Sequence, residues 1–385
     1  MTVAKPRRLS DRQRIAWLRL IRSDNVGPSS FRQLIGRFGS ADAALEALPG
    51  LTRRGGATRP LKIASVSEAE RELEFAERLG VRFIAVGESD YPKLLQQIDN
   101  PPPLIAVKGS TDVFERPGIA IVGARAATAN GMRFTRSLAH ELGSAGLTIV
   151  SGLARGIDTA AHGGSLKTGT VAVFAGGLDR PYPPQNVRLA DEIVTEGGAL
   201  LSEMPLGWSP RAIDFPRRNR LVAGLSYGLV VVEAAQRSGS LVSARMAGEQ
   251  GRLVFAVPGS PIDKQSAGSN GLLKDGATLV TEADDVLRAI SPLIDSPMPA
   301  QSAPRRGALS DAEANFADGD RAGIDDDDQS RVLESLSSVP TDIDEIVRHT
   351  QLSTAQVQLV LLELQLAGRI ERHSGNAVSL LESGI

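Results

Sequence analysis

Six short apolar segments, separated by five helix-like segments, recur in order between residues 118 and 290. They are rich in Val, Ile and Leu and lack polar alternation, which is typical of strands buried on both faces. Strands that alternate with helices predict an α/β fold built on a Rossmann-like, doubly wound parallel sheet. The expected strands are Ile119–Val122, Leu147–Val150, Val171–Phe174, Ala199–Leu201, Leu229–Val232 and Leu253–Val257.

The first of these strands leads into a turn that suits phosphate. Gly118–Val122 is followed directly by Gly123-Ala124-Arg125, and the glycine allows the backbone to turn sharply. Right-handed crossovers bring the loops after parallel strands to one edge, where ligands bind in open α/β sheets. Arg125 would stand at that edge with a guanidinium fork that matches phosphate. The turn lacks G-x-G-x-x-G, so the sequence supports no dinucleotide site, and no cofactor is predicted.

The loop after the second strand is a further candidate for anion binding. Ser151 and Gly152 follow the strand, and Gly156 precedes a helix whose free N–H groups can hold an anion. Asp158 and His162 stand four residues apart on that helix. An acid/base pair is conceivable there, but a structural pair at the helix N-terminus is favoured, and no catalytic residue is predicted.

Residues 211–220 form the strongest candidate for nucleic-acid binding. The stretch reads Arg211-Ala212-Ile213-Asp214-Phe215-Pro216-Arg217-Arg218-Asn219-Arg220. Arginine forks bind phosphates, and an exposed Phe offers a face on which a base can stack. The alternative places Phe215 in the core and pairs some of the arginines with Glu203 or Glu233. The predicted DNA-binding residues are Arg125, Ser151, Gly152, Arg211, Phe215, Arg217, Arg218, Asn219 and Arg220.

Two glycine-serine turns are weaker candidates for anion nests at helix starts. They are Ser238-Gly239-Ser240 and Gly268-Ser269-Asn270-Gly271. Neither turn by itself defines a site.

The first fifty residues read as short helices around a break at Asn25-Val26-Gly27-Pro28. The third of these helices, Asp42–Leu48, is expected to end at Pro49-Gly50. Helix, glycine turn and helix resemble a helix-hairpin-helix or SAM-like module, which can hold a nucleic-acid backbone at the turn. A packing or protein-contact function is favoured.

The last sixty residues have the outline of a winged helix. Thr341 is expected to cap Ile343–His349, Ser353 to cap Ala355–Ala367, and a wing to follow from 369–371 and 377–380. Residues 329–385 hold four Arg, no Lys and seven Asp or Glu. A net-acidic winged helix is poorly suited to reading duplex DNA, so protein contact is favoured. The expected domains are 10–65 (helical module), 66–290 (core), 291–328 (flexible acidic linker) and 329–385 (winged-helix-like domain).

Composition narrows the functions that remain. The formal net charge is −2 over 385 residues, so a nucleic-acid site must be a local basic patch. The chain has no cysteine and four histidines without metal-ligand spacing, so no metal site is predicted. No secretory leader and no apolar run of about 20 residues is apparent, which predicts a cytoplasmic protein with no membrane contact.

A series of motifs in a fixed order resembles the DNA-processing protein DprA (Smf) family over about residues 80–290. The flanking helical module and winged helix also resemble accessory domains of that family. The motifs are 122–125, 151–162 (Ser-Gly-Leu-Ala-Arg-Gly-Ile-Asp-Thr-Ala-Ala-His), 177–183 with Asn186, 202–205, 215–220, 232–234, 238–241, 257–259 and 276–277.

The resemblance implies a single-stranded-DNA-binding protein rather than an enzyme. Members of the family protect incoming strands during natural transformation and help to load RecA recombinase onto them. They bind DNA in a basic pocket of the Rossmann-like domain and usually form homodimers through it. The pocket residues implied by motif are Arg125, Phe215, Arg218 and Arg220. One departure is Ala212, where some members carry a lysine; Arg211 stands beside it.

Two other functions stay open at this stage. The first is an enzyme like the nucleoside-monophosphate phosphoribohydrolases, which use a related sheet. Their P-G-G-x-G-T-x-x-E motif is absent here, because Gly176-Gly177 lacks that continuation and no P-G-G precedes Glu233. The second is a scaffold for RecA or a competence regulator that barely touches DNA.

Overall fold

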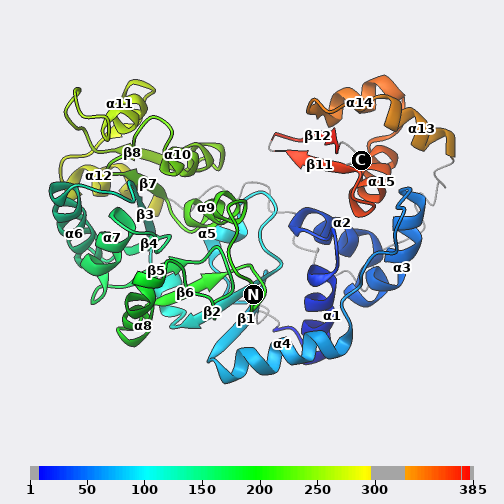
Figure 1. Cartoon of the computed structure of the whole chain (residues 1–385), viewed down its shortest axis with the longest axis horizontal. Helices are drawn as coiled ribbons and strands as arrows, with labels where there is room; N and C mark the ends of the chain where they lie inside the picture. The colour runs from blue at the N-terminus through cyan, green and yellow to red at the C-terminus, as the bar shows by residue number, and fades with distance from the viewer. Residues whose placement is uncertain (1–7, 296–325, 374, 382–385) are drawn as a thin grey trace. The chain divides into compact units, whose positions relative to one another are not determined.

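The structure is a computed structural model that describes residues 8–295, 326–373 and 375–381. The described chain divides into two compact units (Figure 1). Unit 1 contains the long sheet and, of the described residues, comprises Arg8 and 71–295. Unit 2 contains the N-terminal helices from Leu9 to Glu70 together with the C-terminal winged helix. Helix α4 (Val66–Arg78) runs across the boundary in sequence.

Unit 1 is organised around a nine-stranded sheet in the order β1-β2-β6-β5-β4-β3-β7-β8-β9. The seven strands from β6 to β9 in this order are parallel. Starting from β3, the chain adds β4, β5 and β6 on one side and then β7, β8 and β9 on the other side. The strands are β1 (Val81–Ala85), β2 (Leu104–Gly109), β3 (Gly118–Val122), β4 (Thr148–Ser151), β5 (Thr170–Val173), β6 (Ala199–Ser202), β7 (Gly228–Val231), β8 (Leu253–Ala256) and β9 (Thr278–Leu279).

The six strands predicted from apolar runs are all present as parallel strands. The sheet differs from the expectation at both edges. Strands β1 and β2 form an antiparallel extension, since β2 pairs antiparallel with β6. Strand β9 is only two exposed residues long, so it leaves no apolar run in the sequence.

Helices cover both faces of this sheet (Figure 1). One face packs against α6, α7 and α12 through residues such as Leu138, Ile157 and Val286. The other packs against α5, α9 and α10 through residues such as Leu95 and Leu221. Because both faces are covered, strand β3 is buried along its whole length, as its Ile and Val content predicts. The helices are α5 (Lys93–Gln96), α6 (Ala129–Ser144), α7 (Ile157–Ser165), α8 (Val187–Thr195), α9 (Asp214–Gly224), α10 (Gly239–Glu249), α11 (Ala267–Lys274) and α12 (Ala283–Asp295), with short 3-10 turns at Asp112–Phe114 and Pro184–Asn186.

The N-terminal part of unit 2 consists of α1 (Asp11–Arg22), α2 (Pro28–Phe38) and α3 (Ala41–Arg54). Helix α3 continues past Pro49-Gly50, so the predicted end at that dipeptide is wrong. A proline removes one helical N–H but does not end a helix that tertiary packing holds. Here Leu48 and Leu51 are both buried on either side of the proline.

The C-terminal part of unit 2 is a winged helix with its own apolar core. The cap of its second helix is Asp342, which accepts the Asp344 N–H at 2.8 Å, rather than the predicted Thr341. Most of the predicted linker lies outside the described residues, but 291–295 belong to α12 and 326–328 to α13. The elements are α13 (Asp326–Glu334), β10 (Thr341–Asp342), α14 (Ile343–Thr350), α15 (Thr354–Leu366), β11 (Ile370–His373) and β12 (Ala377–Leu380).

Candidate nucleic-acid interface

Two loops and the first turn of a helix at the carboxyl edge of the unit 1 sheet bring Arg125, Tyr182 and Phe215 together. Arg125 follows β3, Tyr182 follows β5, and Phe215 lies in the first turn of α9. The Arg125 guanidinium carbon lies 5.3 Å from the centroid of the Phe215 ring. The Tyr182 and Phe215 rings are 5.7 Å apart in an edge-to-face arrangement. Arg125 is exposed and Phe215 half-buried, so a cation and two aromatic side chains share one accessible surface.

A second aromatic–arginine pair lies in the loop that precedes α9. The Arg211 guanidinium stands 4.4 Å from the centroid of the Trp208 ring. Buried Asp214 holds the pair by accepting hydrogen bonds from Trp208 Nε1 and the Arg211 N–H, both at 2.9 Å. Burial alone would raise the pKa of Asp214, but these hydrogen bonds and the Arg211 charge lower it below its ordinary value.

Two arginines of α9 pair with one buried carboxylate. Glu203, whose side chain is 5% exposed, accepts a hydrogen bond from Arg217 Nε at 3.1 Å and also pairs with Arg220. Arg220 further donates to the Asn100 carbonyl at 3.1 Å. The alternative interpretation, in which some of the arginines pair with Glu203, therefore applies to Arg217 and Arg220. Arg217 remains 46% exposed while Arg220 is 18% exposed.

Arg218 lies beneath the surface rather than on it. Its Nη1 donates to the Gly152 carbonyl at 2.5 Å and to the Val173 carbonyl at 2.6 Å, which joins the loop after β4 to the last residue of β5. A Cβ on residue 152 would lie 2.0 Å from this Nη1, so a larger residue there would displace the Arg218 guanidinium. Burial lowers the pKa of Arg218 to about 10, and the Arg125 charge adds to this while Asp158 opposes it. Arg218 thus remains a cation at neutral pH.

Asp158 and His162 take separate partners. Asp158 accepts the backbone N–H groups of Gly152 and Ala154 at 3.1 and 3.2 Å. Burial raises the pKa of Asp158 against the opposing Arg218 charge. The His162 ring bonds Thr170 Oγ1 through Nδ1 at 2.8 Å, and burial together with the Arg218 charge lowers the pKa of His162 to about 3. Each side chain therefore fixes its own segment, which fits a structural function, although the two bond to other groups rather than to one another.

The remaining predicted residues are mostly engaged inside the fold. Ser151 is buried and donates to the Ile121 carbonyl at 2.7 Å, while Asn219 is half-buried on α9. Ser238 caps α10, whose first residues include Gly239 and Ser240.

The stretch 268–271 differs from the expected turn, because it lies within α11. Ser269 donates to the Ser266 carbonyl, and Asn270 bonds Gly259 through both ends of its amide. These two side chains are thus satisfied inside the fold instead of forming an open nest.

Tyr182 and Trp208 belong to this surface but are not among the residues predicted from the sequence. Tyr182 is 50% exposed, and its ring extends the accessible aromatic surface beside Phe215. The signal that could have found them is their position: both follow a predicted strand on the edge that carries Arg125.

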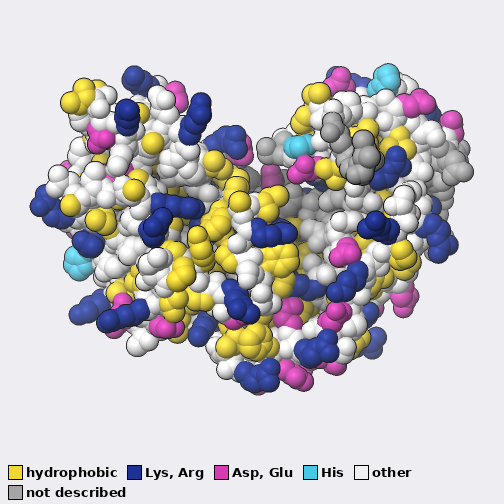
Figure 2. Space-filling view, viewed as in Figure 1, with side chains coloured by type: hydrophobic (Ala, Val, Ile, Leu, Met, Phe, Trp, Pro, Cys, Tyr) yellow, Lys and Arg dark blue, Asp and Glu magenta, His cyan; other side chains and the backbone are white. Residues whose placement is uncertain are grey.

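On the face shown in Figure 2, Lys and Arg side chains are spread among acidic and apolar ones rather than gathered in one basic block. Among the described residues, no group of three His, Asp or Glu side chains is placed to hold a metal ion. No helix in the described ranges has the length and apolarity needed to span a membrane.

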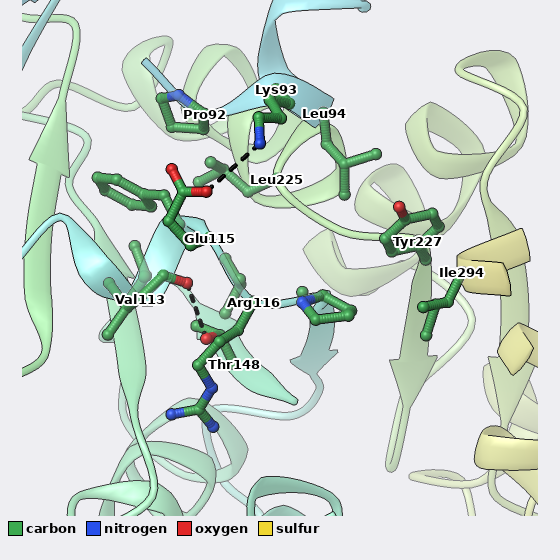
Figure 3. Close-up of a pocket in the computed structure, with 15 residues that line it drawn as sticks. Pro92, Lys93, Leu94, Val113, Glu115, Arg116, Thr148, Leu225, Tyr227 and Ile294 are labelled. Carbon is green, nitrogen blue, oxygen red and sulfur yellow. Dashed lines mark hydrogen bonds and ion pairs between the residues drawn. The ribbon is translucent and has the colours of Figure 1, made fainter. Parts of the chain in front are cut away.

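A cavity of about 270 Å³ lies at the opposite, amino-terminal edge of the sheet. Gly118 and Thr148, the first residues of β3 and β4, line it together with Tyr227 and an exposed Lys93–Glu115 ion pair (Figure 3). The cavity is thus separated from the Arg125–Phe215 surface by the length of the strands.

The fold and the surface together define a class: a doubly wound α/β protein with an N-terminal helical module, a C-terminal winged helix and an arginine–aromatic edge. Residues 82–291 match the family model for DNA recombination-mediator protein A. Residues 11–74 match the DprA-like N-terminal HHH domain, and 317–376 match the DprA winged helix domain. The chain belongs to the DprA (Smf) family.

Individual relatives agree with this assignment. Protein Smf of Synechocystis is 32% identical over 95% of this chain and 98% of its own length. The X-ray structure of DprA from Streptococcus pneumoniae is 40% identical with a TM-score of 0.54, over 58% of this chain and 77% of that chain. A Helicobacter pylori DprA structure, described as showing a single-stranded DNA binding mode, is 29% identical with a TM-score of 0.50, over 55% of this chain and 96% of that chain.

Proposed function

We propose that this chain binds single-stranded DNA at the carboxyl edge of the unit 1 sheet, as a recombination mediator without catalytic activity. The observation that carries the proposal is the surface shared by Arg125, Phe215 and Tyr182. Single strands are held by a cationic groove that follows the phosphates and by aromatic rings on which bases stack. Here a cation, Arg125, and an aromatic ring, Phe215, lie side by side at 5.3 Å.

The arrangement suits a single strand better than a duplex. An aromatic ring can stack only on a base that is free of its neighbours, and bases in a duplex are already stacked. Stacking tolerates every base, so we expect little sequence preference. Arg125, Arg211 and Arg217 are the exposed cations that would contact phosphates, whereas buried Arg218 would shape the edge from below.

The relatives lend support to this proposal. A homologous chain from Helicobacter pylori is described by its single-stranded DNA binding mode, and it covers 55% of this chain. The family resemblance further suggests loading of RecA, a homodimer formed through unit 1 and a cytoplasmic location. Light scattering and RecA-dependent strand exchange on coated single strands would test the dimer and the loading step.

The hydrogen bonds of the Glu233 carboxylate argue against the alternative that the protein is an enzyme. Its carboxylate accepts the Thr128 N–H at 2.9 Å and the Thr128 hydroxyl at 2.5 Å, which fixes the start of α6. A catalytic glutamate needs a carboxylate free to meet its substrate. Incubation with AMP should release no adenine; release that disappears in Glu233→Gln would revive the enzyme.

Fluorescence anisotropy with labelled oligo-dT and with a duplex of equal length tests the proposal. We expect clearly tighter binding of oligo-dT, and affinity that falls with salt by roughly 0.7 log units per phosphate contact for each decade of salt. Equal affinity for both probes would argue against a stacking surface.

A further inference from the structure

The helix that a winged-helix protein usually presents to DNA is buried on two sides in this chain. One face of α15 carries Val357, Val360, Leu361 and Leu364, which lie in the winged-helix core. The opposite face carries Leu359, Leu362, Glu363 and Leu366, and these residues are buried as well. A helix that is apolar all round requires a second packing partner. Helices α3 and α2 of the N-terminal module supply it within unit 2.

An ion pair between a buried carboxylate and a partly exposed arginine stabilises this contact. Glu363, with a side chain only 1% exposed, accepts a hydrogen bond from Arg54 Nε at 2.6 Å. Burial raises the pKa of Glu363, and the charges of Arg54 and Arg37 oppose the rise. An isolated carboxylate at this position would be costly, so the winged helix depends on a cation from the other end of the chain.

Backbone contacts also require the two parts to be adjacent. A Cβ on Gly55 would lie 2.1 Å from the Glu363 carbonyl oxygen, so α3 and α15 approach as closely as only glycine allows. In the same last turn of α15, Asn25 Nδ2 donates to the Leu366 carbonyl at 2.9 Å. Asn25 opens the Asn25–Pro28 turn, the part of a helix-hairpin-helix that would hold a nucleic-acid backbone.

The charges of the two parts are complementary. Residues 9–70 hold ten Lys or Arg and six Asp or Glu, whereas 329–385 hold four Arg and seven Asp or Glu. A basic helical module thus meets an acidic winged helix, and this favours their association over contact of the winged helix with DNA.

We propose that the winged helix is a protein-docking module whose partner is the N-terminal helical module of the same chain. The two elements that could each read DNA, the Asn25–Pro28 turn and α15, are turned toward one another. Unit 2 therefore supplies no duplex-binding site while it is docked. This proposal does not depend on single-strand binding by unit 1.

A cross-link in the full-length chain tests the proposal. Gln33 Nε2 of α2 and Gln358 Oε1 of α15 lie 3.2 Å apart, and the chain has no cysteine of its own. In Gln33→Cys/Gln358→Cys, a short bismaleimide should join the two thiols at least about tenfold faster in the native chain than in urea, because docking raises their effective concentration. Equal rates in both states would overturn the docking.

The locked protein then tests the functional part. Anisotropy with oligo-dT and with duplex DNA should give the same affinities before and after cross-linking. Loss of affinity for duplex DNA on locking would show that the turn or α15 separates to bind it, and would overturn the proposal.

Glycine variants in the same double-cysteine chain provide a matched comparison. Gly55→Ala should slow cross-linking because its Cβ collides with the α15 backbone. Gly36→Ala, at an exposed helical position with open space around its Cβ, should leave the rate unchanged. Equal rates in both variants would contradict the close approach of α3 and α15.

Discussion

The guanidinium of Arg125 lies over the ring of Phe215 at 5.3 Å, although ninety residues separate them in the chain. The contact exists because Arg125 follows the carboxyl end of β3 and α9 begins after the carboxyl end of β6, and both ends lie at the same edge of the sheet. It places a permanent cation and a stacking face next to one another, which is the pairing that a single strand requires.

Arg125→Ala should weaken oligo-dT binding and reduce its salt dependence. Removal of one phosphate contact lowers the log–log slope by about 0.7 on single strands. Titrations at several salt concentrations measure this slope. Arg136→Ala, which removes the same charge from an exposed position on α6, is the control and should leave the slope unchanged. Parallel slopes for the Arg125 variant and the wild type would remove Arg125 from the phosphate contacts.

Tyr182→Ala should also weaken oligo-dT binding, since the Tyr182 ring extends the aromatic surface beside Phe215. One lost stacked base costs about 1–3 kcal/mol. Tyr182→Phe keeps the ring and should bind like the wild type. If the two variants bind alike, the ring itself makes no contact with a base.

Arg218→Ala should destabilise unit 1 by about 3 kcal/mol or more. The substitution removes a buried cation, so the Gly152 and Val173 carbonyls lose their hydrogen-bond donor and Asp158 loses its opposite charge. Urea denaturation measures the change in the free energy of unfolding. Arg217→Ala, an exposed neighbour that shares Glu203 with Arg220, should cost less than about 1 kcal/mol. Similar losses in both variants would contradict the buried position of Arg218.

Stability should fall as the pH is lowered from 6.5 toward about 3 because of His162. The pKa of His162 is 6.5 when unfolded and about 3 when folded, so the unfolded chain binds one more proton in this range. One proton corresponds to about 1.4 kcal/mol per pH unit. His162→Gln should remove that part of the slope in urea denaturation at several pH values. The same substitution at exposed His140 is the control; an unchanged slope in His162→Gln would contradict the shift.

The sequence predicts the core of unit 1 well because its strands are buried on both faces. Such strands need uninterrupted apolar runs, and runs such as Ile119–Val122 are easy to recognise. Strand β9 has two exposed residues and no such run. The end of α3 was also missed, because buried leucines on both sides of Pro49 hold the helix together. Local propensity does not contain that tertiary contribution.

The candidate site shows the same limit. The sequence places Arg125 and Phe215 on one edge, and the structure brings them into contact. The sequence does not show which arginines of α9 are exposed and which are buried. Arg218 turns inward because the Gly152 and Val173 carbonyls need a donor there, and this need arises only when the loops are assembled.

Equilibrium binding of labelled oligo-dT to the wild type, Phe215→Ala and Phe215→Tyr tests the central claim most directly. Single-strand binding at this edge predicts a loss of about 1–3 kcal/mol for Phe215→Ala and near-complete recovery with the ring restored in Phe215→Tyr. Unchanged affinity in Phe215→Ala, with the protein folded, would contradict the proposed site.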